Sequence, residues 1–444
     1  MLSQISLFIS FYIGSIGFLY ILKDKSSWIE KLGLSFPIAS VIWSLVWWLL
    51  NWLFATPINA TLGYITMCVS IFLGLGAILL IRKDNKYIRK FTPGLSLSSM
   101  ATSILIALLA AMMLTNIVYN INTPITDWDS LTLYDFRALR AAENQSLEIE
   151  PLQNSYILGY PLYTSIGHLY GYVFDSHSPK LFYSLLYLSG ILIFYSLLLK
   201  VTSNLISTLG ATTLGLYPLI VQHSYMAYTN LAHSFFVGFA FLYLFEWWRS
   251  GSNRNLFLSS FFIMASSWTR SVEPFFMVYL GILLIMIVQK HRRVRFLISI
   301  LPVLILRQLW EYYRTIRLES GSANVALEVA GLTNSTLDLM KTIANPEHLS
   351  IVWNFFIENA ILPHKSLLLA IFFATLHFII VRSRSGYMLM LINGSLALFI
   401  FLGTLQFSLV YQNWINIPGS LTKVSMTMIP VLIYYVFYSF RSNS

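Results

Sequence analysis

Long apolar runs recur along the chain, and polar residues gather in a few connections between them. The runs are continuously apolar rather than alternating, which favours helices over the strands of a membrane barrel. A helix needs about 20 such residues to cross the hydrocarbon core of a bilayer. The pattern predicts about thirteen apolar spans, at 4–22, 33–54, 61–81, 97–119, 181–199, 202–222, 231–247, 255–268, 274–289, 296–310, 365–381, 387–410 and 421–440.

Composition supports an all-α polytopic membrane protein. Of the 444 residues, 57% are hydrophobic and 10% are charged, and the mean hydropathy is +0.69. The single cysteine, Cys68, lies inside an apolar run, so the sequence contains no disulfide framework. The first run has no basic residues before it and no evident cleavage site after it, so we expect a retained span rather than a signal peptide.

Basic residues in the connections predict the orientation, because lysine and arginine accumulate on the cytoplasmic side. The strongest basic clusters lie at 82–90, 290–295 and 382–384. With these clusters inside, the N-terminus is outside and the C-terminus is cytoplasmic. The long polar connections at 120–180 and 311–364 then face outside. The sequence thus predicts a plasma-membrane protein whose chemistry occurs at the extracytoplasmic face.

The net charge of +10 follows from the same bias. Its basic residues lie mostly in the connections assigned to the cytoplasmic side, where they are attracted to anionic lipid headgroups. A nucleic-acid partner is therefore not indicated.

The stretch from Thr126 to Arg137 is unusually acidic for this chain. Asp127, Asp129 and Asp135 fall within nine positions of a protein that has only 18 acidic residues. We expect an amphipathic surface helix that starts between Thr126 and Asp129 and ends near 143–144. At about 100° per residue, one side of this helix carries Leu131, Tyr134, Ala138, Ala141 and Ala142, and the other carries Asp129, Phe136 and Arg140. A second surface helix is expected over 159–170, with Pro161 in its first turn.

Two interpretations of these carboxylates remain open on spacing alone. Aspartate before an apolar periodic run is an ordinary N-cap, and this applies to Asp127 and Asp129. Asp135 lies within the helix, where solvation or pairing with Arg137 or Arg140 explains it. The alternative is a functional site that contains Asp129.

Three segments of the chain resemble a known family. Trp128-Asp129-Ser130-Leu131 with Phe136-Arg137-Ala138, followed by Gly159-Tyr160-Pro161-Leu162, is similar to the first external loop of GT-C glycosyltransferases of the protein-mannosyltransferase and aminoarabinose-transferase group. The segment Trp268-Thr269-Arg270-Ser271-Val272-Glu273-Pro274 resembles a later turn of that group, and Pro418-Gly419-Ser420-Leu421-Thr422-Lys423 resembles a segment near its end. All three fall at the outer face in the orientation that charge predicts.

The resemblance implies a GT-C-type helical bundle over 97–444, with 1–96 as an N-terminal extension of about three spans. It also implies an inverting glycosyltransferase that moves a sugar from a polyprenyl-phosphate donor to a hydroxyl of a glycan, lipid or protein acceptor. The sequence departs from the group at Asp135, Arg137, Pro274 and Lys423. These departures bear on the sugar and on the phosphate contacts more than on the reaction.

The reaction needs a base for the acceptor proton and cations for the leaving phosphate. The resemblance assigns the base to Asp129, with Asp127 as its support. The candidate phosphate cations are Arg137, Arg140, Arg270 and Lys423, although each of these side chains also suits simple contact with lipid headgroups. Glu273 is expected to orient Arg270, and His168 is a candidate substrate contact.

No cofactor is expected, because arginine and lysine suffice for a lipid monophosphate. Asp127 and Asp129 are nevertheless suited to holding Mg²⁺ or Mn²⁺, so a divalent metal stays an alternative. The main alternative from another class is a transporter or lipid-linked-sugar flippase without chemistry. An oligosaccharyltransferase or ligase of the same superfamily is the second alternative.

Overall fold

The computed structural model describes residues 1–21, 26–81, 97–148, 160–270, 273–290, 294–319, 346–410 and 419–441. These residues are helical apart from their connections and contain no strand. They form two compact units, which we describe one at a time. Unit 1 comprises Met1–Glu150, Leu162–Ala232 and Phe440–Ser444, and unit 2 comprises Pro151–Pro161 and His233–Ser439.

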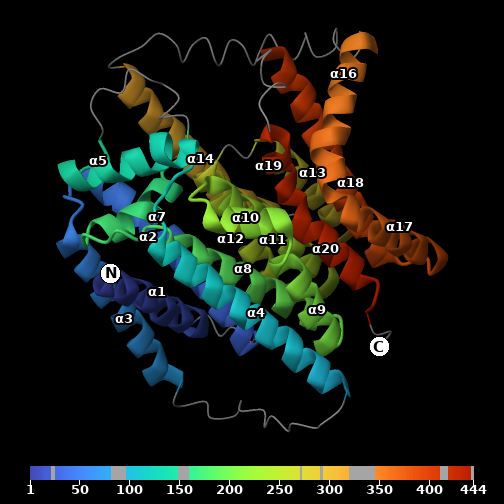
Figure 1. The fold of residues 1–444 in the computed structure, drawn as a ribbon, viewed down its shortest axis with the longest axis horizontal. Helices are drawn as coiled ribbons and strands as arrows, with labels where there is room; N and C mark the ends of the chain where they lie inside the picture. Colours follow the sequence, from blue (N-terminus) through green and yellow to red (C-terminus); the bar gives the residue numbers. More distant parts are fainter. Residues whose placement is uncertain are drawn as a thin grey trace. The chain divides into compact units, whose positions relative to one another are not determined.

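The described part of unit 1 contains ten helical segments before the long helix α11 (Figure 1). They are α1 (Leu2–Ile21), α2 (Trp28–Phe54), α3 (Ala60–Ile81), α4 (Leu97–Asn122), η1 (Ser130–Asp135), α5 (Phe136–Asn144), α7 (Tyr163–Tyr172), α8 (Leu181–Leu199), α9 (Asn204–Gly215) and α10 (Pro218–Tyr225). The helix α11 (Thr229–Ser250) starts in unit 1 and continues in unit 2.

Small residues allow α1 and α3 to pack closely in unit 1. A Cβ atom added to Gly17 would lie 2.6 Å from the Cα atom of Gly74, and one added to Gly14 would lie 2.8 Å from the carbonyl oxygen of Ser70. Close backbone approach through small residues is a common way for helices to associate in membranes. Residues on both sides of the predicted division at 96 belong to unit 1. Position 96 itself lies outside the described residues, and the division stays a prediction.

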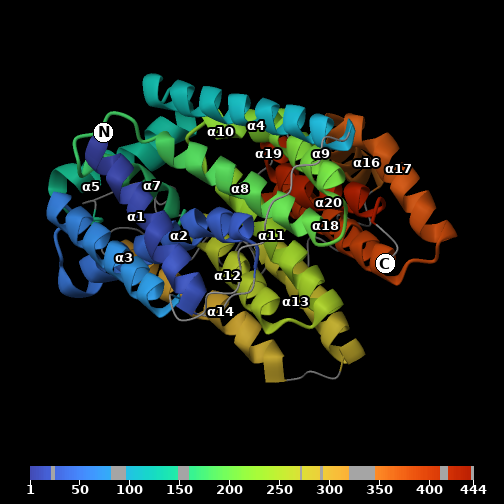
Figure 2. The same cartoon turned by 90° about the horizontal axis from the view of Figure 1, so that it is seen from below.

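Unit 2 contains the remainder of α11 and the helices that follow it. They are α12 (Asn253–Thr269), α13 (Glu273–Lys290), α14 (Val294–Glu319), α16 (Pro346–Phe356), η2 (Ile357–Ile361), η3 (Leu362–His364), α17 (Lys365–Ile380), α18 (Arg384–Val410), α19 (Ser420–Ser425), η5 (Met426–Met428) and α20 (Ile429–Tyr438). Here α12 packs against α14, and α18 packs against α13, α16 and α20. Figure 2 shows the helices α12, α13 and α14 of this unit side by side.

The predicted apolar segments fall on helices of the structure, which confirms the all-α class. Among the described residues, seven helices are long and apolar enough to cross a membrane, or eight if α9 and α10 form one span bent by 57°. This is a multi-pass membrane protein. Three further apolar helices, Leu2–Gly17, Ala60–Gly76 and Phe275–Val288, are shorter than a typical span. The finer count of about thirteen spans therefore stays a prediction.

The polar connections differ from those predicted. Residues Pro346–Ile380 form one of the candidate spans, and α14 extends to Glu319, so much of 311–364 is helical. The part of this connection at 320–345 lies outside the described residues. In the earlier connection, α5 is amphipathic as predicted, with Ala138 and Ala141 buried and Arg140 exposed.

The second predicted surface helix is not at the surface. It corresponds to α7, in which every residue from Tyr163 to Gly171 is buried. This helix packs against α2 and α5, and a Cβ atom added to Gly167 would lie 2.6 Å from the ring of Phe182 in α8. The prediction of a surface helix was wrong here because α7 consists mainly of aromatic, apolar and small residues and fills the interior of unit 1.

Candidate functional site

The acidic stretch of unit 1 lies where the chain turns from α4 into a new helix. The helix α4 ends at Asn122, residues 124–127 are non-helical, and helical structure resumes at Trp128. The backbone carbonyl of Asp127 accepts a hydrogen bond from the N–H of Leu131 at 2.9 Å. Asp127 therefore lies at the start of this helix, and a capping role for its side chain stays a prediction.

Asp129 is not used as a cap. It precedes η1, but its side chain makes no capping hydrogen bond, and the residue is partly exposed. Trp128, between the two aspartates, is 76% exposed. Asp129 is thus partly exposed, and capping does not account for it.

The helix that follows Asp129 is irregular. Residues Ser130–Asp135 form a π-helical turn, in which the N–H of Phe136 donates to the carbonyl of Leu131, five residues earlier. π-helical turns are rare in proteins. Where a single one occurs within an α-helix, it is often at a functional site. This turn also explains why the regular helical wheel fails for Leu131, which is 42% exposed, whereas Tyr134, Ala138 and Ala141, predicted on the same side, are buried.

Tyr228, in the connection between α10 and α11, interacts with Asp129. The pKa of Tyr228 is raised to about 12, first by burial and then by the negative charge of Asp129. A hydrogen bond with the Asp129 backbone lowers it, and the charge of Asp127 and a hydrogen bond with the Asp129 side chain add smaller increases. A tyrosine with this pKa is protonated at neutral pH. Its hydroxyl is therefore a donor beside the carboxylate.

Lys180 provides a positive charge near the acidic stretch. Its Nζ atom donates to Thr123 Oγ1 at 2.8 Å and lies 4.9 Å from the ring centroid of Tyr119, at the end of α4. Burial lowers the pKa of the Lys180 ammonium, and the negative charge of Asp127 opposes that effect. Lys180 thus ties the start of α8 to the end of α4 and partly balances the charge of Asp127.

Asp135, at the other end of the π-helical turn, takes part in a buried polar cluster. Asp135 Oδ1 lies 2.9 Å from His168 Nδ1 and accepts a hydrogen bond of 2.5 Å from the Tyr172 hydroxyl. His168 Nε2 lies 2.8 Å from the Tyr183 hydroxyl. Asp135 is 6% exposed and His168 is 0% exposed. The expectation that Asp135 is solvated or paired with an arginine of the loop was wrong, because η1 turns it toward α7.

The observed partners of His168 are all internal. Both of its ring nitrogens are within hydrogen-bonding distance of side chains of unit 1. The role of His168 as a substrate contact stays a prediction. The hydrogen bonds of His168, which lies in α7, connect Asp135 of η1 to Tyr183 of α8.

The two loop arginines lie in different environments. Arg137 is 1% exposed, and its Nε atom donates to Ser165 Oγ of α7 at 3.0 Å. Arg140 is exposed and pairs with Glu143 at 3.1 Å. Of the two, Arg140 has the side chain that is accessible to a ligand.

The remaining predicted site residues belong to unit 2. Arg270 follows α12, and its guanidinium carbon lies 5.9 Å from the ring centroid of Tyr160. This contact brings together two segments that carry the family resemblance, those around Tyr160 and Arg270. Glu273 is the first residue of α13.

Lys423 lies in the short helix α19, also in unit 2. Gly419 precedes this helix with a φ of 69°, a left-handed conformation that favours glycine. Thr422 donates to the carbonyl of Asn359 at 2.8 Å, and Ser425 Oγ lies 2.8 Å from His364 Nε2. The side chain of Lys423 is partly exposed.

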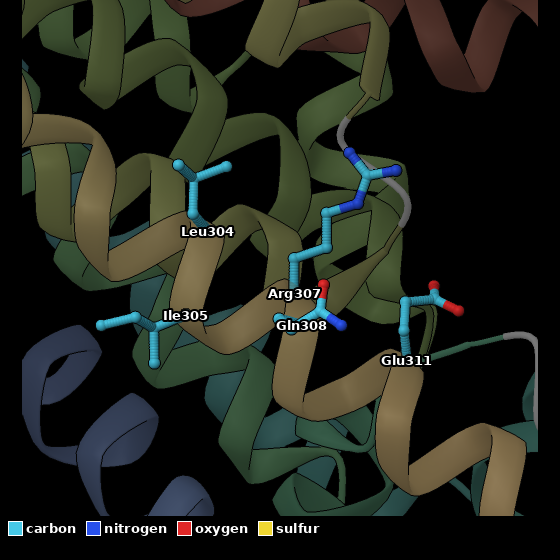
Figure 3. Close-up of a pocket in the computed structure, with 5 residues that line it drawn as sticks. All are labelled: Leu304, Ile305, Arg307, Gln308 and Glu311. Atoms are coloured by element: carbon cyan, nitrogen blue, oxygen red, sulfur yellow. The ribbon is translucent and has the colours of Figure 1, made fainter.

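A pocket lies along α14 of unit 2 (Figure 3). Its described lining consists of Leu304, Ile305, Arg307, Gln308 and Glu311, all from neighbouring turns of one helix. Glu311 also accepts a hydrogen bond from Arg314 at 2.7 Å. No predicted site residue is part of this described lining.

The described residues contain no preformed group of metal ligands. In this part of the chain, no three histidine, cysteine or acidic side chains are grouped as metal ligands would be. Asp127 and Asp129 together provide two carboxylates, which is fewer than the three ligands of such a group. A divalent metal held by Asp127 and Asp129 stays a prediction.

Sequence reasoning did not identify Lys180, Tyr172, Tyr183 or Tyr228. Lys180 and Tyr228 lie 51 and 99 residues after Asp129, as their numbers show, and no local pattern joins them to the acidic stretch. The one available signal in the sequence is that Lys180 and Tyr228 are polar residues that shortly precede a predicted span. Comparisons of the chain with protein-family models, with curated proteins and with solved structures found no match.

Proposed function

We propose that this protein is an inverting glycosyltransferase that uses a polyprenyl-phosphate sugar donor at the extracytoplasmic face of the membrane. The observation that carries the proposal is the partly exposed Asp129 at the π-helical turn, which interacts with Tyr228. A membrane enzyme of this kind needs an ionised carboxylate that a substrate hydroxyl can reach. The family resemblance of the same segment supports the same residue.

In the proposed reaction, Asp129 accepts the proton of the acceptor hydroxyl as its oxygen attacks the anomeric carbon. The bond from that carbon to the phosphate oxygen breaks, and the lipid phosphate leaves with the electron pair. Attack opposite to the leaving group inverts the anomeric configuration. General-base catalysis of this type contributes about 10²–10⁴-fold to a rate.

The surroundings of Asp129 give each neighbour a role. The Tyr228 hydroxyl orients the carboxylate by donating to it, and Asp127 with Lys180 adds a pair of opposite charges to the same region. Arg140 of the same unit is a proposed cation for the lipid phosphate. In unit 2, Arg270 and Lys423 stay candidate phosphate cations on the family resemblance alone. Glu273 is proposed to orient Arg270.

Substitution of Asp129 tests the proposal. Membrane vesicles that contain Asp129→Asn are incubated with a radiolabelled polyprenyl-phosphate hexose, and product formation is measured. We expect transfer to fall at least about 10²-fold, because asparagine cannot accept the proton. Asp175→Asn is a matched control, since Asp175 is exposed in the same unit and has a φ of 54°, which asparagine tolerates.

The outcomes separate the proposal from its alternatives. Near wild-type transfer by Asp129→Asn would contradict the assignment of the base. Movement of the labelled lipid between leaflets without product, in the wild type, would identify a flippase instead.

A further inference from the structure

Asp135, His168, Tyr172 and Tyr183 form a buried cluster that takes no direct part in the proposed reaction. The cluster is connected to the proposed base, Asp129, by the π-helical turn. Asp135 is the last residue of the π-helical turn, and Asp129 directly precedes the first. The cluster therefore holds one end of the turn, and the candidate base lies at the other end.

The hydrogen bonds of the cluster converge on the Asp135 carboxylate. His168 can donate from Nδ1 to Asp135 while its Nε2 atom pairs with the Tyr183 hydroxyl. Tyr172 then donates to the same carboxylate oxygen of Asp135. The Asp135 side chain thus receives two donors, as a buried carboxyl group needs hydrogen-bond partners.

The register of the turn decides where Asp129 points. A π-helical turn accommodates one residue more than an α-helical turn. If Ser130–Asp135 returned to α-helical geometry while α5 stayed in place, the residues before it would rotate by about 100° around the helix axis. Asp129 would then leave Tyr228, and Leu131 would move to the buried side that carries Ala138.

Contacts of α5 with α7 hold the helix that directly follows the π-helical turn. Arg137, two residues after Asp135 in the chain, donates to Ser165 at 3.0 Å. Ala138 and Ala141 are buried with 1% and 0% exposure. With α5 held in this way, the hydrogen bonds of Asp135 to His168 and Tyr172 hold the C-terminal end of the turn against α7.

We propose that Asp135, with His168, Tyr172 and Tyr183, is a positioning cluster that keeps the π-helical turn in register and so directs the Asp129 carboxylate. The register part of this inference stands on the structure alone. Its consequence for catalysis rests on the proposed function.

Thiol labelling measures the register directly. In a Cys68→Ser background, Leu131→Cys reports on the turn and Leu139→Cys is the matched control, since the two leucines are 42% and 43% exposed. A slip of the turn buries position 131 and leaves position 139, in α5, unchanged. The probe is a maleimide, applied to the purified protein in detergent.

We expect Asp135→Leu to slow the labelling of the thiol at position 131 at least fivefold and to leave that at position 139 within twofold. Asp135→Asn and Tyr172→Phe should have smaller effects in the same direction, because each keeps part of the hydrogen bonding. They also serve as the test if Asp135→Leu does not fold. Unchanged labelling at position 131 in the variants that fold would overturn the inference, as would faster labelling at both positions in all three variants.

The catalytic consequence is read separately in the transfer assay. In Tyr172→Phe and Asp135→Asn we expect kcat to fall at least fivefold while KM for the lipid donor changes less than twofold. Loss of donor binding instead would contradict positioning. If the wild type shows no transfer, the proposed function fails, but the labelling experiment still decides the role of the cluster.

Discussion

At the scale of single residues, Asp127 and Asp129 show how neighbours with the same side chain take different roles. Asp127 begins the helix through its backbone carbonyl and lies in the field of Lys180. Asp129 lies inside the helix and interacts with Tyr228. Resemblance to a family motif predicts Asp129 as the base. The different surroundings of the two aspartates depend on Lys180 and Tyr228, which belong to distant segments of the chain.

Tyr228 provides a residue-scale prediction. Tyr228→Phe removes the hydroxyl and keeps the ring, so we expect the transfer rate to fall about tenfold, which corresponds to about 1.4 kcal/mol and is close to the usual effect of a hydrogen bond to a charged group. Because the pKa of Tyr228 is raised to about 12, its hydroxyl stays a donor at pH 10, where an ordinary tyrosine is half ionised. The ratio of wild-type to Tyr228→Phe rates should therefore be the same at pH 7 and pH 10. A ratio that disappears by pH 10 would contradict this role.

At the scale of elements, a polar network joins α4 to α8 and α10 within unit 1. Asn120 Nδ2 donates to Ser184 Oγ and to the carbonyl of Ser224, each at 2.8 Å. Asn116 Nδ2 donates to Ser224 Oγ at 2.7 Å. In a membrane, where helices gain little from the hydrophobic effect on associating, such bonds help to hold them together.

Substitution of Asn120 tests this network. Asn120→Leu removes the donor that serves the acceptors in α8 and α10, so we expect a loss of about 1–2 kcal/mol in stability. Thermal unfolding in detergent should show a lower Tm. Thr115→Val in the same helix is the control, because Thr115 is exposed and donates to the carbonyl of Ala111 in its own helix. Equal Tm values for the two variants would show that the network adds no stability.

At the scale of the whole molecule, the orientation predicted from charge can be measured. In a Cys68→Ser background, Leu2→Cys and Phe440→Cys place single thiols near the two ends of the chain, at residues that are 80% and 59% exposed. We expect a membrane-impermeant maleimide to label the thiol at position 2 in intact cells and to label that at position 440 only after permeabilisation. The reverse pattern would place the acidic stretch on the cytoplasmic side and would contradict an extracytoplasmic reaction.

The sequence by itself determined the class of the protein and the approximate positions of its helices. Continuous apolar runs can satisfy their backbone hydrogen bonds in a membrane only as helices, so the predicted runs became helices. The amphipathic face of α5 followed from the same kind of local pattern, through Ala138 and Ala141.

The tertiary structure decided what lies beside the acidic stretch. Lys180 lies near it because of the packing of α8, and Tyr228 because of the position of the connection before α11. Packing against α7 buries Asp135, the last residue of the π-helical turn. No periodicity in the sequence encodes these contacts, because they join residues that meet only when the helices pack.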